Sequence, residues 1–259
     1  MSWLHAHRGA SADAPENTLA AFRLGLDQGA DGIELDVHLS ADGVPVVIHD
    51  GFLDRTTDRR GEVAAMTASE VALADTRAAW VGGSAERATL AAAWPAADTH
   101  VPLLRDVLAW LPRDRALVLD VKVVAAIEAT LDLLGSRRTG GGTTRLISFL
   151  PAAIERAHAL APWLATGLLL DEQEDLRAGV DWAREHGHRS MVPWDPDLDA
   201  GAQLRRAVAL VHGAGLQLGA YTVNEAARAR ELRGAGIDFL MSDVPGRIVA
   251  SRRPRATLN

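Results

Sequence analysis

The chain has 259 residues, of which 48% are hydrophobic and 24% charged, a composition typical of a folded globular protein. It contains no cysteine, which excludes disulfides, thiolate zinc sites and a cysteine nucleophile, so any bound metal needs oxygen or nitrogen ligands. The net charge of −7 argues against a nucleic-acid partner. No apolar run has the length of a signal peptide or a membrane span, which favours a cytoplasmic protein without stable membrane insertion.

Short apolar runs that predict strands alternate with longer segments of helical pattern along the whole chain. The predicted strands are Trp3–His7, Gly32–Val37, Val46–His49, Ala116–Lys122, Arg145–Phe149, Thr166–Leu170, Ser190–Trp194, Gln217–Tyr221 and Asp238–Ser242. Long Ala- and Leu-rich segments between them, such as Thr18–Gln28, Ala125–Leu134 and Ala202–His212, can form crossover helices. This alternation favours a parallel α/β sheet.

One of these nine strands is too close to its predecessor for a parallel crossover. Only residues 38–45 separate Val37 from Val46, and the turn signal Asp42-Gly43 lies among them. Since a parallel connection needs a dozen or more residues, Val46–His49 should return antiparallel to Gly32–Val37. Eight parallel strands remain, and a length of about 250 residues suits a (β/α)₈ TIM barrel.

We expect residues 1–259 to form one barrel domain with a capping insertion at 51–100, after the second strand. This segment has turn signals, polar runs and an Ala-rich stretch but no regular βα unit, and long loops of this kind often serve as lids. Elsewhere, Gly140–Gly142 predicts a flexible loop, and the basic cluster at Arg252, Arg253 and Arg255 a solvated tail.

Polar residues recur where the predicted strands end, which is where the active site of a (β/α)₈ barrel lies. The first strand ends in His7-Arg8, the second carries Glu34 and Asp36, and the fourth run carries Asp120 and Lys122. Residues two apart on a strand share a face, so the two members of each pair project together. The alternative is a set of salt bridges, Glu34 with Arg8 and Asp120 with Lys122, but the recurrence at three strand ends favours a functional site.

The residue types at these ends suit metal-assisted phosphoryl chemistry. Carboxylates without cysteine favour a hard divalent cation, Mg²⁺ or Ca²⁺. His7 and His49 can transfer protons near neutral pH, and the hairpin should bring His49 back over the barrel mouth to face His7. Arg8 and Lys122 can neutralise phosphoryl oxygens.

An ordered series of short motifs resembles the glycerophosphodiester phosphodiesterase family. In chain order they are His7-Arg8-Gly9, Pro15-Glu16-Asn17-Thr18, Glu34-Leu35-Asp36-Val37, Val47-Ile48-His49-Asp50, Leu53-Asp54-Arg55-Thr56-Thr57, Ser148-Phe149, Thr222-Val223-Asn224 and Ser242-Asp243-Val244-Pro245. The resemblance implies the same barrel with a small insertion. It also implies hydrolysis of a small glycerophosphodiester to glycerol 3-phosphate and an alcohol, with a divalent cation.

Residue by residue, the resemblance implies three sets of roles. The metal ligands are Glu34, Asp36 and Asp120, although the family usually has glutamate in place of Asp120. The acid–base pair is His7 and His49, in either order. The substrate and phosphate contacts are Arg8, Lys122 and Tyr221, the last standing where the family commonly has tryptophan.

Several neighbouring residues are assigned weaker roles. Asn17 either caps the first helix or acts in the site, and Trp194 packs or contacts the alcohol. We expect a solvated loop at Asp171, Glu172 and Glu174, a satisfied core position for His5, and a loop-fixing role for Asp243.

Two alternative functions stay open. A lysophospholipase D-like enzyme, or another phosphodiesterase of the superfamily, would need an apolar groove, for which Trp80 and Trp94 are candidates. A barrel that binds a phosphorylated ligand without turnover is the other. The oligomeric state is not predicted.

Overall fold

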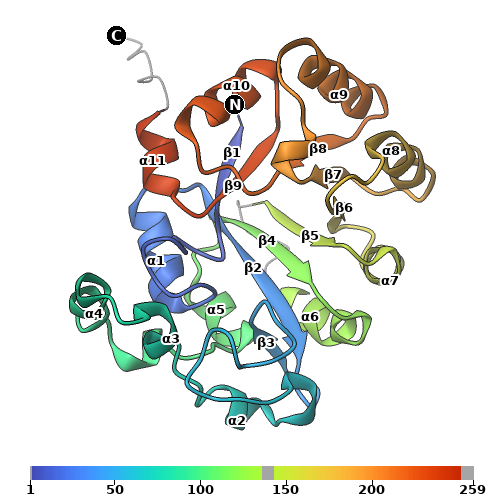
Figure 1. Cartoon of the computed structure of the whole chain (residues 1–259). Helices are drawn as coiled ribbons and strands as arrows, with labels where there is room; N and C mark the ends of the chain where they lie inside the picture. Colours follow the sequence, from blue (N-terminus) through green and yellow to red (C-terminus); the bar gives the residue numbers. More distant parts are fainter. Residues whose placement is uncertain (1, 136–142, 252–259) are drawn as a thin grey trace.

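A computed structural model describes residues 2–135 and 143–251 and contains a closed barrel of eight parallel strands (Figure 1). The predicted glycine loop at 140–142 and the basic tail lie outside these residues. Around the barrel the strands run in the order β1-β2-β4-β5-β6-β7-β8-β9, and β9 pairs with β1. Their bounds are β1 Trp3–His7, β2 Gly32–Leu39, β4 Ala116–Val121, β5 Thr144–Ser148, β6 Ala165–Leu170, β7 Ser190–Pro193, β8 Gln217–Ala220 and β9 Phe239–Ser242. The predicted TIM barrel is confirmed.

The remaining strand, β3 (Pro45–Val47), lies outside the barrel as the returning arm of a hairpin. It pairs antiparallel with β2, with Val37 opposite Val47 and Leu39 opposite Pro45. This pairing confirms the antiparallel return predicted from the short connection between the two strands. The strand ends two residues before His49, so His49 lies on the chain that leaves the hairpin.

Helices cover the outside of the barrel between successive strands. Their bounds are α1 Leu19–Asp27, α5 Leu104–Trp110, α6 Ile127–Leu134, α7 Pro151–Leu160, α8 Leu176–Glu185, α9 Gly201–Gly213, α10 Ala226–Ala235 and α11 Pro245–Ala250. Helix α1 begins after Thr18, whose side chain accepts a hydrogen bond from the backbone N–H of Ala21. Gly25 lets this helix approach β1 closely, because a Cβ there would lie 2.6 Å from the Cβ of Ala6.

Two apolar layers hold the barrel together. The inner layer consists of side chains that point into the barrel: Val118, Ile147, Leu169, Val192, Phe239 and Met241. The outer layer fills the space between strands and helices and includes Leu4, Phe22, Leu35 and Leu119. Because side chains alternate along a strand, the inward face that carries Val118 near the barrel floor carries Asp120 one step nearer the mouth.

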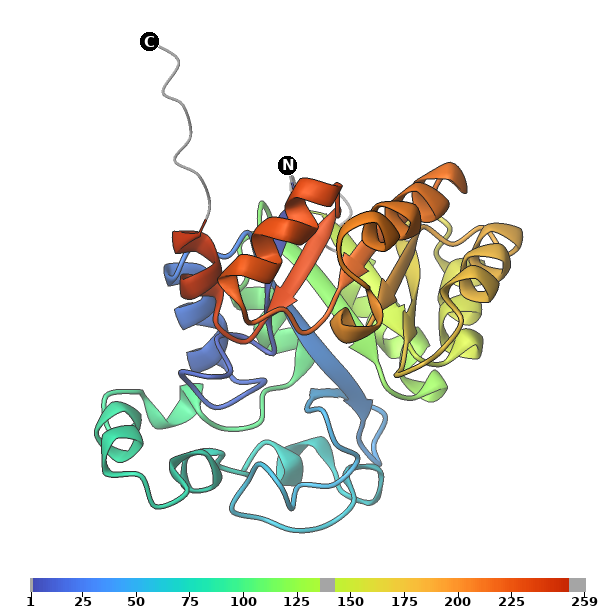
Figure 2. The ribbon, with the colours of Figure 1, turned by 45° about the horizontal axis from the view of Figure 1, so that its top comes forward.

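The segment between β3 and α5 contains short helices and has a small core of its own. Its helical elements are η1 Val63–Ala65, α2 Ala68–Val71, α3 Arg77–Val81, α4 Ala85–Ala91 and η2 Ala96–Asp98. Leu53, Val63 and Val71 pack there against Val46 and Ile48 of the hairpin arm. Figure 2 shows the segment at the end of the barrel toward which β2 runs. Its action as a cap stays a prediction.

Candidate active site

Strand register brings the three predicted carboxylates together at the carboxyl end of the barrel. Glu34 of β2 lies beside His7 of β1, and Asp36 lies beside Asp120 of β4. Glu34, Asp36 and Asp120 are buried, and each offers an oxygen within 4.8 Å of the others'. The three line one wall of a cavity of about 550 Å³.

The hydrogen-bond partners of these carboxylates leave an acceptor oxygen available for a cation. Oδ1 of Asp120 is buried and has no hydrogen-bond partner within residues 2–135 and 143–251. Burial, together with the charge of Asp36, raises the pKa of Glu34 to about 7. Burial also raises the pKa of Asp120 to about 6, although Lys122 opposes the shift. Buried carboxylates of this kind favour either a proton or a metal ion, so the donor set fits Mg²⁺ or Ca²⁺.

Arg8 and Lys122 supply positive charge beside the carboxylates. Nζ of Lys122 lies 2.8 Å from Oδ1 of Asp36 and also contacts Asp120. Nε of Arg8 lies 3.3 Å from Oδ2 of Asp36. Of the two salt bridges offered as the alternative to a functional site, the one between Lys122 and Asp120 therefore forms, whereas in the described structure the Arg8 side chain pairs with Asp36 in place of Glu34. It is the backbone N–H of Arg8 that donates to Glu34, at 2.9 Å. Burial would raise the pKa of Asp36, but the charges of Lys122 and Arg8 outweigh it and hold that pKa below its usual range.

His7 is held from behind by a carboxylate of the last strand–helix loop. Its Nδ1–H donates to Oδ1 of Asp243 at 2.7 Å, and the hydroxyl of Ser11 donates to the same oxygen at 2.9 Å. Nε2 of His7 faces Glu34 at 4.0 Å. Burial would lower the pKa of His7, but Glu34 and Asp243 outweigh it and raise that pKa. Asp243 therefore orients His7 in addition to joining its loop to Asn224.

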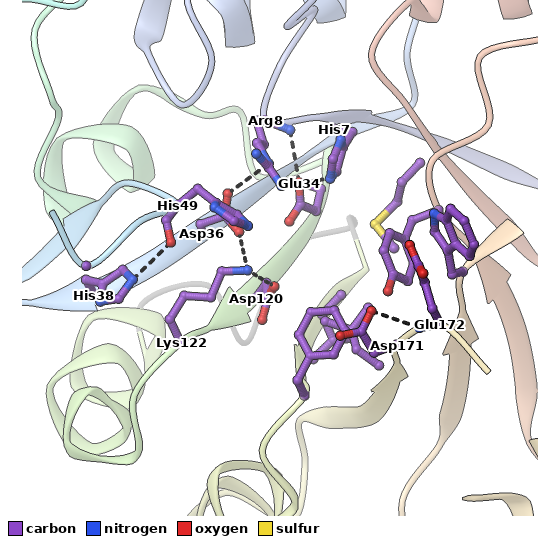
Figure 3. A pocket seen from close by; sticks show the side chains of 17 residues that line it. His7, Arg8, Glu34, Asp36, His38, His49, Asp120, Lys122, Asp171 and Glu172 are labelled. Atoms are coloured by element: carbon purple, nitrogen blue, oxygen red, sulfur yellow. Dashed lines mark hydrogen bonds and ion pairs between the residues drawn. The ribbon is translucent and has the colours of Figure 1, made fainter. Parts of the chain in front are cut away.

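His49 has a corresponding arrangement on the other side of the carboxylates. Its Nδ1–H donates to Oδ1 of Asp50 at 2.6 Å, and its backbone oxygen lies 3.0 Å from Nε2 of His38. Figure 3 shows His7 and His49 flanking Glu34 in the view into the cavity. Burial lowers the pKa of His49, more than the charge of Asp36 raises it. Both predicted imidazoles thus line the cavity, each oriented through Nδ1.

The opposite wall of the cavity is aromatic with an acidic rim. Tyr221, Phe149 and Trp194 line it, and the Tyr221 hydroxyl donates to the backbone oxygen of Leu170 at 2.8 Å. Asp171 and Glu172 are exposed, as a solvated loop requires, but both also line the cavity, on the side away from His38 and His49 in Figure 3. These two residues are therefore part of the cavity wall.

Two weaker predictions are corrected by the structure. Asn17 is not the helix cap, which is Thr18. Asn17 instead donates from Nδ2 to Asp36 at 2.7 Å and accepts from the Asp36 N–H at 3.2 Å, so it orients a carboxylate. His5 is a buried core residue as predicted, and burial lowers its pKa to about 3, but its Nδ1 has no hydrogen-bond partner in the described part of the chain.

His38 lines the cavity and was missed by the sequence reasoning. A signal for it existed. It is two residues beyond Asp36 on β2, and the same period of two that links Glu34 with Asp36 places His38 on their face.

Comparison with known proteins agrees with this geometry. Residues 7–247 match the model of the glycerophosphoryl diester phosphodiesterase family. A solved phosphodiesterase from Oleispira antarctica is 27% identical, with a TM-score of 0.82 over 97% of this chain and 96% of that chain. A solved glycerophosphodiester phosphodiesterase from Agrobacterium tumefaciens is 30% identical, with a TM-score of 0.76 over 96% and 100% of the two chains.

Some curated relatives match over shorter segments at higher identity. Glycerophosphodiester phosphodiesterase 1 of Rattus norvegicus is 54% identical over 66 residues, which are 26% of this chain and 20% of the rat protein. YqiK of Bacillus subtilis is 46% identical over 110 residues, which are 42% of this chain and 40% of YqiK. The chain thus spans less than half the length of these two relatives. With the family model matched from the first strand to the last helix, the chain belongs to the glycerophosphoryl diester phosphodiesterase family.

Proposed function

We propose that this protein hydrolyses glycerophosphodiesters to glycerol 3-phosphate and an alcohol. The observation that carries the proposal is a single cavity that combines three buried carboxylates, two cationic side chains and two oriented imidazoles. The Oleispira antarctica relative, solved in complex with the product sn-glycerol-3-phosphate, supports the choice of substrate. Hydrolysis of a phosphodiester needs neutralised phosphoryl oxygens, a base for the attacking water and an acid for the leaving oxygen.

Glu34, Asp36 and Asp120 would hold the divalent cation, Mg²⁺ or Ca²⁺. The chemistry supplied by such an ion, when bound, is Lewis-acid polarisation of a phosphoryl oxygen. Arg8 and Lys122 would bind the remaining phosphoryl oxygens, because both extend into the cavity beside Asp36. The ring of Tyr221, which lines the cavity, would pack against the substrate, because its hydroxyl is already bound to the backbone oxygen of Leu170.

His7 and His49 would serve as the proton-transfer pair. Each donates its Nδ1–H to a carboxylate, Asp243 or Asp50, which leaves Nε2 as the atom that exchanges a proton with the substrate. One histidine takes a proton from the attacking water as its oxygen bonds to phosphorus, and the other gives a proton to the alcohol oxygen as its bond to phosphorus breaks. These two roles require both imidazoles to reach the same substrate, and both line one cavity.

The test is release of glycerol 3-phosphate from glycerophosphocholine and glycerophosphoethanolamine, across a series of divalent cations with an EDTA control. His7→Ala and His49→Ala should each lower kcat by about 10²–10⁴-fold, the usual contribution of a general acid or base. The matched control is His186→Ala, a histidine exposed at the end of α8. Normal turnover by both variants would exclude the pair. Tight ligand binding without product at any metal concentration would instead support the non-catalytic barrel.

A second candidate substrate is a lysophospholipid, favoured by apolar side chains at the barrel mouth. Phe52, Val124, Phe149 and Leu150 follow strands that end at the mouth and are at least 36% exposed, and Phe149 also lines the cavity. Trp80 and Trp94, predicted for this role, pack against each other at 5.2 Å, away from the lining of the main cavity. Faster turnover of lysophosphatidylcholine than of glycerophosphocholine, lost in Leu150→Ser, would favour this substrate.

The proposal includes a cytoplasmic location, a small-molecule substrate and no nucleic-acid partner. Within the described residues, no helix is both long and apolar enough to cross a bilayer. The capping role of residues 51–100 is proposed as well. Gly51 is the one residue of that segment in the described lining of the main cavity, so closure would require the segment to move toward the mouth.

A further inference from the structure

Arg55, in the loop that follows His49, binds two carboxylates at once. Its Nη1 and Nη2 donate to the two oxygens of Glu16 at 3.0 and 2.9 Å. Its Nε and Nη2 donate to the two oxygens of Asp50 at 2.6 and 3.1 Å. Both pairs are bidentate, the geometry in which a guanidinium fixes a carboxylate in orientation as well as in position. Arg55 is absent from the described lining of the main cavity, so these contacts do not belong to direct substrate binding.

Each of the two carboxylates also holds one reactive group of the proposed site. Asp50 accepts the Nδ1–H of His49 at 2.6 Å. Glu16 accepts from Nη1 of Arg8 at 3.1 Å. Asp50 lies on the chain leaving the hairpin, whereas Glu16 lies between β1 and α1, so Arg55 joins two segments that are far apart in the sequence.

We infer that Arg55 is a positioning residue that fixes the His49 imidazole relative to the Arg8 guanidinium. The inference rests on the proposed function, because it assigns to Arg55 the alignment of a proton-transfer group with a phosphate-binding group. Hydrogen bonds from Arg55 also hold the pKa of Asp50 at about 2, which keeps the carboxylate behind His49 ionised. Misplacement of a reactive group by about 1 Å can cost about 10²-fold in rate, so alignment of this kind affects kcat strongly.

A purely structural role is the competing explanation, because Arg55 also fastens the loop after the hairpin to the barrel. The two explanations differ in what Arg55→Ala changes. Loss of alignment lowers kcat while cation binding by Glu34, Asp36 and Asp120 persists, since Arg55 contacts none of them in the described structure. If Arg55 only holds this loop against the barrel, its loss lowers thermal stability and leaves kcat of the folded enzyme unchanged.

The experiment compares Arg55→Ala and Arg55→Lys with Arg60→Ala, an exposed arginine of the same loop. We expect kcat to fall about 10²-fold in Arg55→Ala. Arg55→Lys should restore little, because an ammonium cannot make two bidentate pairs. Guanidinium chloride, well below denaturing concentrations, should partly restore kcat in Arg55→Ala and not in Arg60→Ala. The added guanidinium can reach the vacated position from solvent, since Arg55 is 47% exposed and lines a second cavity of about 130 Å³.

A second measurement does not depend on turnover. Long-range ¹H–¹⁵N spectra of the imidazoles, assigned with His49→Ala, should show His49 as a single Nδ1–H tautomer in the unmodified protein. Arg55→Ala should show a mixture of tautomers, and Arg60→Ala should not. An unchanged His49 tautomer, or an unchanged kcat with lower stability, would overturn the inference. An unmodified protein that turns over none of the diesters would count against the proposed function alone, since the tautomer test still decides the role of Arg55.

Discussion

Asp243→Asn isolates the orientation of His7 from the rest of the site. The substitution keeps the shape of the side chain and removes its charge. Oδ1 of Asp243 accepts from His7 and Ser11, and Oδ2 accepts from Nδ2 of Asn224 at 2.7 Å. An amide has one acceptor oxygen, so the introduced side chain must turn its NH₂ toward either His7 or Asn224, each of which donates. With the NH₂ toward Asn224 one hydrogen bond is lost, and with the NH₂ toward His7 the bonds from His7 and Ser11 are both lost. In either orientation the remaining bonds are no longer charge-assisted.

The size of the effect follows from that loss. A hydrogen bond to a charged group contributes about 1.5–3 kcal/mol, and the Asp243 side chain is 29% exposed, which favours the lower part of this range. If that energy is needed to hold and stabilise the imidazole in the transition state, kcat should fall by about 10- to 150-fold. KM should change less, because His7 is not proposed to bind the ground-state phosphate.

The assay is initial-rate release of glycerol 3-phosphate at saturating cation, with thermal unfolding measured on the same samples. Asp238→Asn is a matched control, because Asp238 precedes the same strand β9 and pairs with His212 at 2.9 Å at the opposite end of the barrel. A kcat within about twofold of the unmodified enzyme, well below the smallest loss expected from a charged hydrogen bond, would refute the orienting role. An equal loss of kcat in Asp238→Asn would refute it as well.

Three further predictions concern the metal site and the barrel. Asp120→Asn should weaken cation binding, measured by calorimetry, by at least about 10–100-fold. Loss of a residue that only hydrogen-bonds to a metal ligand already has this cost, and Asp120 is proposed as a ligand itself. Burial raises the pKa of Glu34 to about 7 and that of Asp120 to about 6, so protons compete with the cation for both carboxylates. Cation affinity should therefore fall as pH is lowered from about 8 to about 5. An affinity independent of pH would contradict those shifts. Gly32→Ala should destabilise the protein by about 1–3 kcal/mol, because the new Cβ would lie 2.1 Å from the backbone oxygen of the adjacent strand. Thermal unfolding checks it, with Gly213→Ala, which has open space, as control.

The barrel and the central carboxylates could be predicted because both depend on local rules. Alternating strands and helices indicate a parallel sheet, and connection length alone identified β3 as a hairpin arm. Once the sheet is parallel, residues two apart at strand ends must share the mouth, which brings Glu34 and Asp36 together and places Asp120 beside them.

The residues that orient His7 and Asp36 could not be predicted in the same way, because they are distant in the sequence from the groups that they hold. The bond between His7 and Asp243 joins residues 236 positions apart, across the closure of the barrel. The orienting role of Asn17 depends on the chain turning one residue before the helix cap, with Asn17 at a φ of +58°. Short motifs mark such residues as important without indicating which neighbour each one holds.

Charge balance in the cavity supports a divalent cation over a monovalent one. Three carboxylates, Glu34, Asp36 and Asp120, face two permanent cations, Arg8 and Lys122, so the ionised inner site has an excess of one negative charge. A phosphodiester brings a second negative charge into the same buried space. Uncompensated charge is costly there, and the raised pKa values of Glu34 and Asp120 already reflect that cost in the free protein. One divalent cation cancels both excess charges, whereas a proton on Glu34 or Asp120 would cancel only one and remove a ligand, so substrate and cation should each favour the binding of the other.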